Sequence, residues 1–547
     1  MQLALLLLTV LFGWIAEAKM LIGYFPNWLY ANYPVEQIPY DKYTHINYAF
    51  AVLNTPDLLP SFTDDWAVQS GLPKLVTMAH DAGTKVLLSI GGWTGSMRFS
   101  SMVASPESRK NFIDWNMDFI RDYETDGVDI DWEYPGRQAA GCNEVASEDV
   151  TNFRLLLQEL REALDTNFPD NHKEISLAVH VEPFRTDDHP ALKDVSDFVP
   201  FFDHINLMTY DINGAWAEQT GPNAPFVSEE GKGAPYSFVE SIQQWKAAGV
   251  PAEKMTAGVA FYGRSMQLAG TQEAVSQYMD AKVGAPKGDS DDAYWADPYC
   301  SADIDGLSGV WKWTNLRSEG VLLDDYTKAG SGWERHWDDV TKTPYLINTE
   351  TNVLVSYDDP ASLATKVDYA LCEDIGGLMV WDIHQDNGEL LDVVKNIRTG
   401  TCANGKTASS LENASQAVPA VGAASSASSA SYPDASAAPI RPSSSAVPTA
   451  ASDSVSASVD SSSSFMITSR LLAPSASSSN VAASSSLGSA AFSLAGATCS
   501  AAGENQCVDS GASAEYLTCV YGEWISRKCS PGTVCHDDAG PMRCDLA

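Results

Sequence analysis

Short apolar runs recur along the chain and constrain the fold more than any other feature of the sequence. Eight of them begin near residues 20, 44, 85, 127, 175, 204, 255 and 376. Stretches with the apolar spacing of an amphipathic helix separate most of the runs, for example residues 108–124 and 150–164. Strands that alternate with helices in this way predict an α/β fold, a (β/α)8 barrel that occupies residues 19–402.

The interval between the seventh and eighth runs is much longer than the others. A connection of this length is unusual without secondary structure of its own. We therefore expect an inserted α+β subdomain at about residues 267–345, rich in Trp and Tyr and carrying Cys300.

The segments outside the barrel differ sharply from it in composition. Residues 1–18 hold an apolar run that is too short to span a bilayer and ends in small residues, which predicts a secretory signal peptide. Residues 403–497 are mostly Ser and Ala with scattered Pro, which predicts a disordered linker suited to O-glycosylation. Asn413 begins an N-glycosylation acceptor sequence.

The ten cysteines are distributed unevenly. Four are scattered over the barrel segment, and six lie in residues 498–547, where they predict a small disulfide-rich module. No CxxC pair occurs, which argues against zinc. Six cysteines allow fifteen pairings, and their spacing does not choose among them.

The net charge of -37 limits the partners of the chain. A strongly acidic protein is repelled by nucleic acids and by anionic membrane surfaces. We therefore expect a neutral or cationic partner, no nucleic acid and no membrane. From the signal peptide and the cysteines we expect a secreted protein, extracellular or associated with a cell wall, and we expect it to be a monomer.

The stretch DGVDIDWEYP at residues 126–135 places three carboxylates on one face of a strand. Asp129, Asp131 and Glu133 are each two residues apart, so they project toward the interior and the carboxyl end of the barrel. Crowded carboxylates share protons, and a carboxyl group that keeps its proton can act as a general acid. Calcium is the alternative ligand, but the flanking residues lack a short Gly-bearing loop, so we expect no metal.

Four further motifs stand at the ends of other predicted strands. They are SIGGW at 89–93, MTYD at 208–211, YGR at 262–264 and MVWD at 379–382. Together with DGVDIDWEYP, and in this order, they resemble the motifs of glycoside hydrolase family 18, the chitinases. The resemblance extends from Leu21 to Arg398. It implies a TIM barrel and an enzyme that needs no cofactor and hydrolyses the β-1,4 linkages between N-acetylglucosamine units of chitin and chitin oligosaccharides.

The resemblance also implies roles for individual residues. Glu133 would protonate the glycosidic oxygen, and the acetamido group of the substrate would attack the anomeric carbon to give an oxazolinium ion with retention of configuration. Asp131 would orient that group, Asp129 would share a proton with Asp131, and Tyr210 would hydrogen-bond the acetamido oxygen. The residues implied in substrate binding are Tyr24, Phe50, Trp93, Met208, Asp211, Tyr262, Arg264, Met379 and Trp381.

The fifth strand departs from the family pattern. It reads AVHVEP at residues 178–183, where many relatives have small residues and an earlier proline. His180 or Glu182 could alter a subsite or the pH profile, and a hydrogen-bonded structural role is the alternative for the histidine.

The module at residues 498–547 resembles carbohydrate-binding module family 19 of fungal chitinases, on its six cysteines and the segment LTCVYGEWISRKCSPGTVC. Tyr516, Tyr521 and Trp524 are the candidate residues for stacking on chitin, and core packing is the alternative for Trp524.

Two alternatives to a chitinase are a catalytically silent chitin-binding lectin on the same barrel and an endo-acting glycosidase on N-linked glycans. The presence of Glu133 argues against the first, and Trp132, Trp381 and the motif at 208–211 argue against the second.

Overall fold

The computed structural model describes residues 19–402, apart from 31, 187–188, 271–274 and 303–305, together with residues 505–508, 510, 512–513, 515–520, 523–528, 533–536 and 543–546. The expected signal peptide at 1–18 and the expected linker at 403–497 lie outside the described residues. The chain divides into two compact units, each of which is described by itself.

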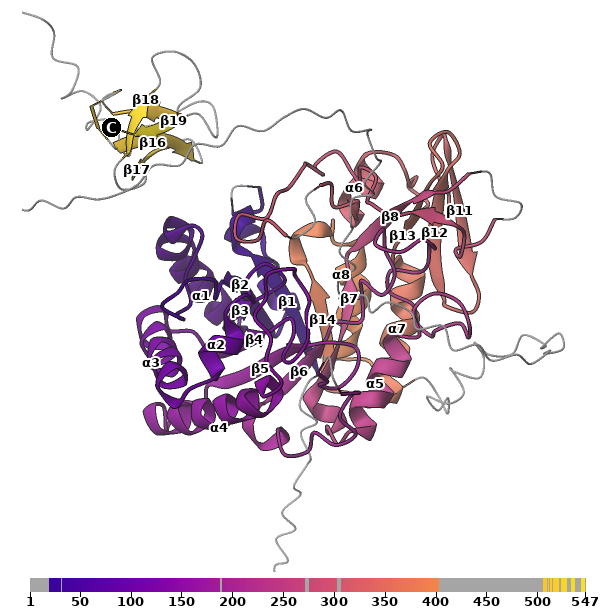
Figure 1. Ribbon diagram of the computed structural model, residues 1–547. Helices are drawn as coiled ribbons and strands as arrows, with labels where there is room; N and C mark the ends of the chain where they lie inside the picture. Colours follow the sequence, from indigo (N-terminus) through magenta and orange to yellow (C-terminus); the bar gives the residue numbers. More distant parts are fainter. Residues whose placement is uncertain are drawn as a thin grey trace, which may run out of the picture. The chain divides into compact units, whose positions relative to one another are not determined.

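The first unit is built on a closed barrel of parallel strands (Figure 1). The strands, in their order around the barrel, are β1 (Met20–Pro26), β14 (Gly377–Trp381), β7 (Met255–Ala260), β6 (His204–Leu207), β5 (Glu174–Val179), β4 (Gly127–Asp131), β3 (Lys85–Gly91) and β2 (His45–Ala51). All eight coincide with the apolar runs of the sequence, so the predicted barrel is confirmed. Because the strands are parallel, their carboxyl ends meet at one mouth of the barrel.

Helices connect these strands and cover the outside of the barrel (Figure 1). They are α1 (Leu72–Asp81), α2 (Phe99–Val103), α3 (Pro106–Tyr123), α4 (Asp149–Asn167), α5 (Phe238–Ala247), α7 (Pro360–Cys372) and α8 (Glu389–Val394). The start of α3 is typical, since Ser105 caps it by accepting a hydrogen bond from the amide of Ser108 and Pro106 occupies its first turn. The two longest helices match the two stretches from which helices were predicted.

The inserted subdomain is an antiparallel sheet with one short helix, α6 (Trp313–Ser318). Its strands are β8 (Tyr262–Leu268), β9 (Ala281–Lys282), β10 (Val310–Lys312), β11 (Trp333–Asp338), β12 (Thr343–Asn348) and β13 (Val353–Ser356). The sheet therefore extends beyond the expected range of 267–345 on both sides. β8 follows β7 after a single residue, which places the start of the sheet at the mouth of the barrel.

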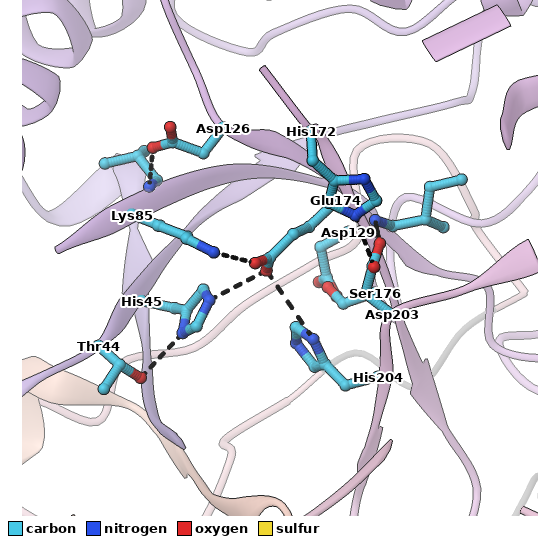
Figure 2. A network of polar contacts seen from close by, with 12 residues as sticks. Thr44, His45, Lys85, Asp126, Asp129, His172, Glu174, Ser176, Asp203 and His204 are labelled. Atoms are coloured by element: carbon cyan, nitrogen blue, oxygen red, sulfur yellow. Dashed lines mark hydrogen bonds and ion pairs between the residues drawn. The ribbon is translucent and has the colours of Figure 1, made fainter. Parts of the chain in front are cut away.

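An ion-pair network closes the opposite, amino-terminal end of the barrel (Figure 2). Glu174 begins β5, and its carboxylate contacts Lys85 at the start of β3. The same carboxylate lies 3.0 Å from His45 Nε2, at the start of β2, and 4.0 Å from His204 Nδ1, at the start of β6. The network thus joins the first residues of four strands.

The second unit is described only as short strands, β15 (Asn505–Cys507), β16 (Glu515–Val520), β17 (Glu523–Lys528), β18 (Thr533–His536) and β19 (Arg543–Leu546). A disulfide joins Cys507 to Cys535. Among the helices of the described part of the chain, none has the length and apolar character that a membrane span requires.

Candidate active site

The acidic row of β4 lies inside the barrel, and its members become progressively less buried toward the mouth. The side chains of Asp129, Asp131 and Glu133 are 0, 4 and 9 % exposed. Ser89 on β3 and Ser176 on β5 pair in register with Asp129, so both serines point inward at its level.

Asp129 is surrounded by hydrogen-bond donors. Its Oδ2 accepts from Ser89 Oγ at 2.7 Å and from Tyr24 Oη at 2.8 Å, and its Oδ1 accepts from Ser176 Oγ at 2.5 Å and from Asn206 Nδ2 at 3.2 Å. Burial raises the pKa of Asp129, and these four donors partly offset that rise. The side chain is therefore fixed on every side by the barrel interior.

Asp131 is buried like Asp129 but lacks such donors. Its Oδ1 has no hydrogen-bond partner within the described part of the chain. Burial, followed by the charges of Glu133 and Asp129, raises the pKa of Asp131 well above its ordinary value. A buried carboxylate oxygen without a donor is costly, so this oxygen is suited to accept a hydrogen bond from a bound molecule.

Glu133 follows the end of β4 and is held through its backbone. Its amide donates to Ser96 Oγ at 3.1 Å, and its carbonyl oxygen accepts from Asn143 Nδ2 at 2.8 Å. Burial raises the pKa of Glu133 to about 7, a hydrogen bond from Tyr134 and the charge of Arg137 oppose the rise, and the charge of Asp211 adds to it. A carboxyl group with this pKa holds its proton in weakly acidic solution, as a general acid must.

The SIGGW motif allows β3 to approach β4 closely. A Cβ on Gly91 would lie 2.1 Å from the carbonyl oxygen of Asp131, and Gly91 has a φ of 114°. Only glycine meets both conditions without strain. The amide of Gly92 then donates to the same carbonyl oxygen at 2.8 Å, which fixes the backbone of the acidic row.

An aromatic cluster lies beside the acidic row. Trp381, at the end of β14, has its ring centroid 5.6 Å from that of Tyr24 and 5.7 Å from that of Phe50, with an interplanar angle of 22° to Phe50. The apolar cluster around these rings also includes the predicted residues Met208, Tyr210 and Met379. The structure therefore brings together six of the residues predicted from separate strands.

Asp211, in the MTYD motif after β6, binds two residues of the YGR motif that follows β7. Tyr262 Oη donates to its carboxylate at 2.7 Å, and Arg264 donates through Nε at 2.9 Å and Nη2 at 2.6 Å. Tyr210, one residue earlier, donates to Met379 Sδ at 3.6 Å, its one hydrogen bond among the residues that the structure describes. A thioether is a weak acceptor, so a stronger acceptor on a ligand can replace it.

Three predicted residues lie outside these clusters. Trp93 stands on the loop after β3 and is 38 % exposed. The ring of His180 contacts the ring of Tyr134 edge to face, with centroids 5.1 Å apart, and burial lowers the pKa of His180 well below its ordinary value. Glu182 lies 3.6 Å from Arg137, whose guanidinium lies 4.3 Å from the centroid of the Tyr134 ring. His180 and Glu182 follow the end of β5 at Val179, and both lie near the residue that follows Glu133.

The sequence reasoning missed several residues of the site. Trp28 is half exposed, and its ring is stacked on Phe50 with centroids 6.2 Å apart, which extends the aromatic surface outward from Trp381. Ser176 and Asn206, which bind Asp129, were also missed, and Ser89, which binds it too, was given no role although it begins the SIGGW motif. Each is a small polar residue within an apolar strand, and only the strand register shows that they converge.

In the second unit, Tyr516 is partly buried and packs against Cys507 and Cys535. Tyr521 lies outside the described residues, and Trp524 is placed only by its backbone, opposite Cys519 in the pairing of β16 with β17. In the described part of the chain, no group of His, Cys, Asp and Glu side chains is arranged to hold a metal ion.

Comparisons with known proteins agree with this site. The profile of Glycosyl hydrolases family 18 matches residues 20–386, and that of Carbohydrate binding domain (family 19) matches residues 475–539. The chain is 34 % identical to a chitinase-like effector of Moniliophthora roreri over 70 % of this chain and 93 % of that protein. It is 30 % identical to chitotriosidase-1 of Mus musculus over 68 % of this chain and 74 % of that one.

Solved structures give the same result. The crystal structure of the chitinase RmChi1 from Rhizomucor miehei matches with a TM-score of 0.63 and 33 % identity, over 70 % of this chain and 100 % of that one. The Group IV chitinase of Ostrinia furnacalis in complex with allosamidin matches with a TM-score of 0.58 and 27 % identity, over 69 % and 98 % of the two chains. The barrel, the acidic row and these matches together show that the chain belongs to glycosyl hydrolases family 18 and carries a family 19 carbohydrate-binding domain.

Proposed function

We propose that this protein is a secreted chitinase that cleaves β-1,4 linkages between N-acetylglucosamine units with retention of configuration, using the acetamido group of the substrate as the nucleophile. The observation that carries the proposal is the contrast between Asp129, which four donors surround, and Asp131, whose buried Oδ1 has none in the described part of the chain. An acetamido N–H is a donor of the kind that this oxygen lacks.

In the first step, Glu133 gives its proton to the glycosidic oxygen while the acetamido carbonyl oxygen attacks the anomeric carbon. The bond to the leaving sugar breaks, and a positively charged oxazolinium ion forms. Asp131 accepts the acetamido N–H and, as a carboxylate, stabilises the developing positive charge. Tyr210 donates its hydroxyl to the acetamido oxygen in place of Met379 Sδ.

In the second step, Glu133 is ionised and removes a proton from a water molecule that attacks the anomeric carbon. The oxazolinium ring opens, and Glu133 regains its proton. Two inversions at one carbon give the β-anomer. Asp211 is less suited to act as a nucleophile, because Arg264 and Tyr262 already engage both of its oxygens.

The aromatic cluster would hold the sugar. Ring faces of N-acetylglucosamine carry C–H groups that stack on flat apolar surfaces, and the ring of Trp381 packs with those of Tyr24 and Phe50. The predicted sharing of a proton between Asp129 and Asp131 remains part of this proposal.

A chitin-binding protein without hydrolytic activity is the second candidate. It is favoured by the names of two relatives, which are described as chitinase-like effectors. Such a protein needs the aromatic cluster and the carbohydrate-binding domain but has no need of a proton donor. The raised pKa of Glu133 favours the enzyme.

The test is the rate of hydrolysis of chitin oligosaccharides by the natural chain and by Glu133→Gln, which removes the proton donor at nearly constant volume. We expect a loss of about a hundredfold to ten-thousandfold, the scale of general acid catalysis, with unchanged binding of the oligosaccharides. A natural chain that binds but does not hydrolyse them would establish the second candidate instead.

Secretion is part of the proposal as well. The predicted signal peptide at 1–18 supports it, as do disulfides between Cys142 and Cys300, Cys372 and Cys402, and Cys507 and Cys535, since such bonds persist in oxidising compartments.

A further inference from the structure

Glu133 lies just beyond the part of β4 that strand pairing holds in place. The pairing of β4 with β3 ends at Asp131, two residues earlier. The main chain of Glu133 is held instead by two side chains, since its amide donates to Ser96 Oγ at 3.1 Å and its carbonyl oxygen accepts from Asn143 Nδ2 at 2.8 Å. The position of the catalytic acid therefore depends on how firmly Ser96 and Asn143 are themselves held.

Ser96 belongs to the same rigid region as the acidic row. It is fully buried, and its Oγ lies 2.8 Å from the carbonyl oxygen of Gly92 and 3.1 Å from that of Asp131. Asn143 is different, because it lies on the loop that leads from β4 to α4, ten residues after Glu133. A loop residue must be ordered by other contacts before its side chain holds a neighbour in one place.

The two chain neighbours of Asn143 supply such contacts. Cys142, immediately before it, forms a disulfide with Cys300, which is 3 % exposed and belongs to the inserted subdomain. Glu144, immediately after it, forms an ion pair with Arg98 on the loop after β3. Asn143 is therefore held on both sides, and the tie on one side is covalent.

We propose that Asn143 is a positioning residue for the catalytic acid, and that the Cys142–Cys300 disulfide holds the side-chain amide of Asn143 against the carbonyl oxygen of Glu133. This inference rests on the proposed function and names what places its proton donor. Without the Asn143 amide, the peptide plane after Glu133 gains freedom to rotate, and the carboxyl group moves with it. A displacement of about 1 Å lowers a rate about a hundredfold, because the reacting atoms no longer meet in line.

The test compares two substrates that depend differently on the proton of Glu133. The sugar that leaves a chitin oligosaccharide must be protonated, whereas para-nitrophenolate is a stable anion and leaves the N-acetylated disaccharide without protonation. The value of kcat/KM reports this step for both substrates. We expect Asn143→Ala to lower kcat/KM about tenfold to a hundredfold on the oligosaccharide and to lower it much less on the para-nitrophenyl disaccharide. The same contrast is expected for Glu133→Gln, which removes the proton itself.

Asn116→Ala is the matched control. Asn116 Nδ2 also donates to a main-chain carbonyl oxygen, that of Phe112 at 2.9 Å, but within α3 on the outside of the barrel. This control should leave kcat/KM on both substrates unchanged. If Asn143 had only a structural role, Asn143→Ala would lower kcat/KM on both substrates by one factor. That result, or an unchanged value on both, would overturn the proposal.

A second arm tests the disulfide. Cys142→Ser with Cys300→Ser should lower kcat/KM more on the oligosaccharide than on the para-nitrophenyl disaccharide. In a chain that already carries Asn143→Ala the same pair should cause little further loss, because both changes act through one hydrogen bond. Cys372→Ser with Cys402→Ser is the control and should leave both values unchanged, since that disulfide joins the end of α7 to the chain after α8. Losses that add in the combined variant would contradict the role of the disulfide.

Should the Cys142→Ser and Cys300→Ser pair not fold, Glu144→Gln loosens the other side of Asn143 and leaves the disulfide intact. We expect it to lower kcat/KM more on the oligosaccharide as well, and equal losses on the two substrates would count against the proposal. A natural chain that hydrolyses neither substrate would overturn the proposed function and this inference with it. A natural chain that hydrolyses both, with Asn143→Ala equally active, would contradict the positioning role alone.

Discussion

At the scale of single residues, the proton of Glu133 governs the pH dependence of the reaction. Burial raises its pKa to about 7, and the reaction begins with Glu133 protonated. The value of kcat/KM should therefore fall as the pH rises through about 7. Asp131 must be ionised at the same time, so its raised pKa sets the fall on the acid side, and the two apparent pKa values belong to the coupled pair.

A substitution of Tyr134 should change the pH at which kcat/KM falls on the alkaline side. Its hydroxyl stabilises the ionised form of Glu133 by a hydrogen bond and thereby lowers the pKa of Glu133. Tyr134→Phe should shift the fall of kcat/KM to higher pH, measured on a soluble oligosaccharide. Tyr236→Phe is the matched control, since Tyr236 contacts His180 and not Glu133. A shift of the Tyr134→Phe profile to lower pH would show that the hydrogen bond is not the cause.

At the scale of the structural elements, the network in Figure 2 ties the starts of β2, β3, β5 and β6 together through Glu174. Burial alone would raise the pKa of Glu174, but the hydrogen bond and charge of His45, together with the charges of His204 and Lys85, hold it well below its ordinary value. Burial, followed by the charge of His45, lowers the pKa of His204 to about 3. Above that pH His204 is neutral, so His45 and Lys85 are the main partners of the carboxylate.

Both shifts make the protein less stable in acid. His204 is neutral in the folded state, whereas in the unfolded chain its pKa is about 6.5, so stability falls as the pH drops from there toward 3. Glu174 contributes stability above its unfolded pKa of about 4.3 and loses it as the pH falls through the lower folded value.

Glu174→Gln removes the centre of this network and leaves Lys85 and His45 without the carboxylate that they contact. We expect a loss of about 1 kcal/mol in the free energy of unfolding at neutral pH, because Lys85 is half exposed and solvent screens its pairing with the carboxylate. Thermal unfolding at pH 7 and pH 3 measures it, and the difference from the natural chain should shrink in acid. Glu162→Gln on the exposed face of α4 is the control, and an equal loss at both pH values would contradict the assignment.

The elements also show what the sequence could predict. The barrel followed from the spacing of its apolar runs along the chain, because strands buried on both faces are mostly apolar. The inserted sheet begins earlier than expected, because residues 255–263 form a single apolar run in the sequence. In the structure this run contains the parallel strand β7 and the start of the antiparallel strand β8. Which strand pairs with which neighbour is decided by tertiary contacts, which leave no local signal.

Some features of the candidate active site could be predicted from the sequence, and others could not. The acidic row could be predicted from the sequence, because residues two apart in a single strand point to the same face. The pairing of Cys142 with Cys300 and the stacking of Trp28 on Phe50 join residues that lie on different elements and apart in the sequence. No spacing rule connects them, so only the folded chain shows these contacts.

At the scale of the whole molecule, the carbohydrate-binding domain should matter only for insoluble substrate. A domain joined by a long linker raises the effective concentration of the active site at a chitin surface, whereas a soluble oligosaccharide gains nothing from it. A chain that ends at Asn404 should keep its rate on short oligosaccharides and lose binding to and turnover of insoluble chitin.

The measurement is co-sedimentation with insoluble chitin, together with rates on both substrates. Trp524→Ala in the full chain should reproduce part of the loss if Trp524 stacks on sugar. Should the shortened chain sediment with chitin as fully as the complete one, the domain would not be the anchor.

The central claim is that the acetamido group of the substrate, rather than a carboxylate or a directly attacking water, reaches the anomeric carbon first. Time-resolved proton NMR of the first products from a chitin oligosaccharide tests it, recorded before the anomers equilibrate. Attack by the acetamido oxygen followed by water inverts the carbon twice, so the account predicts that the β-anomer appears first. The α-anomer as the initial product would contradict the account.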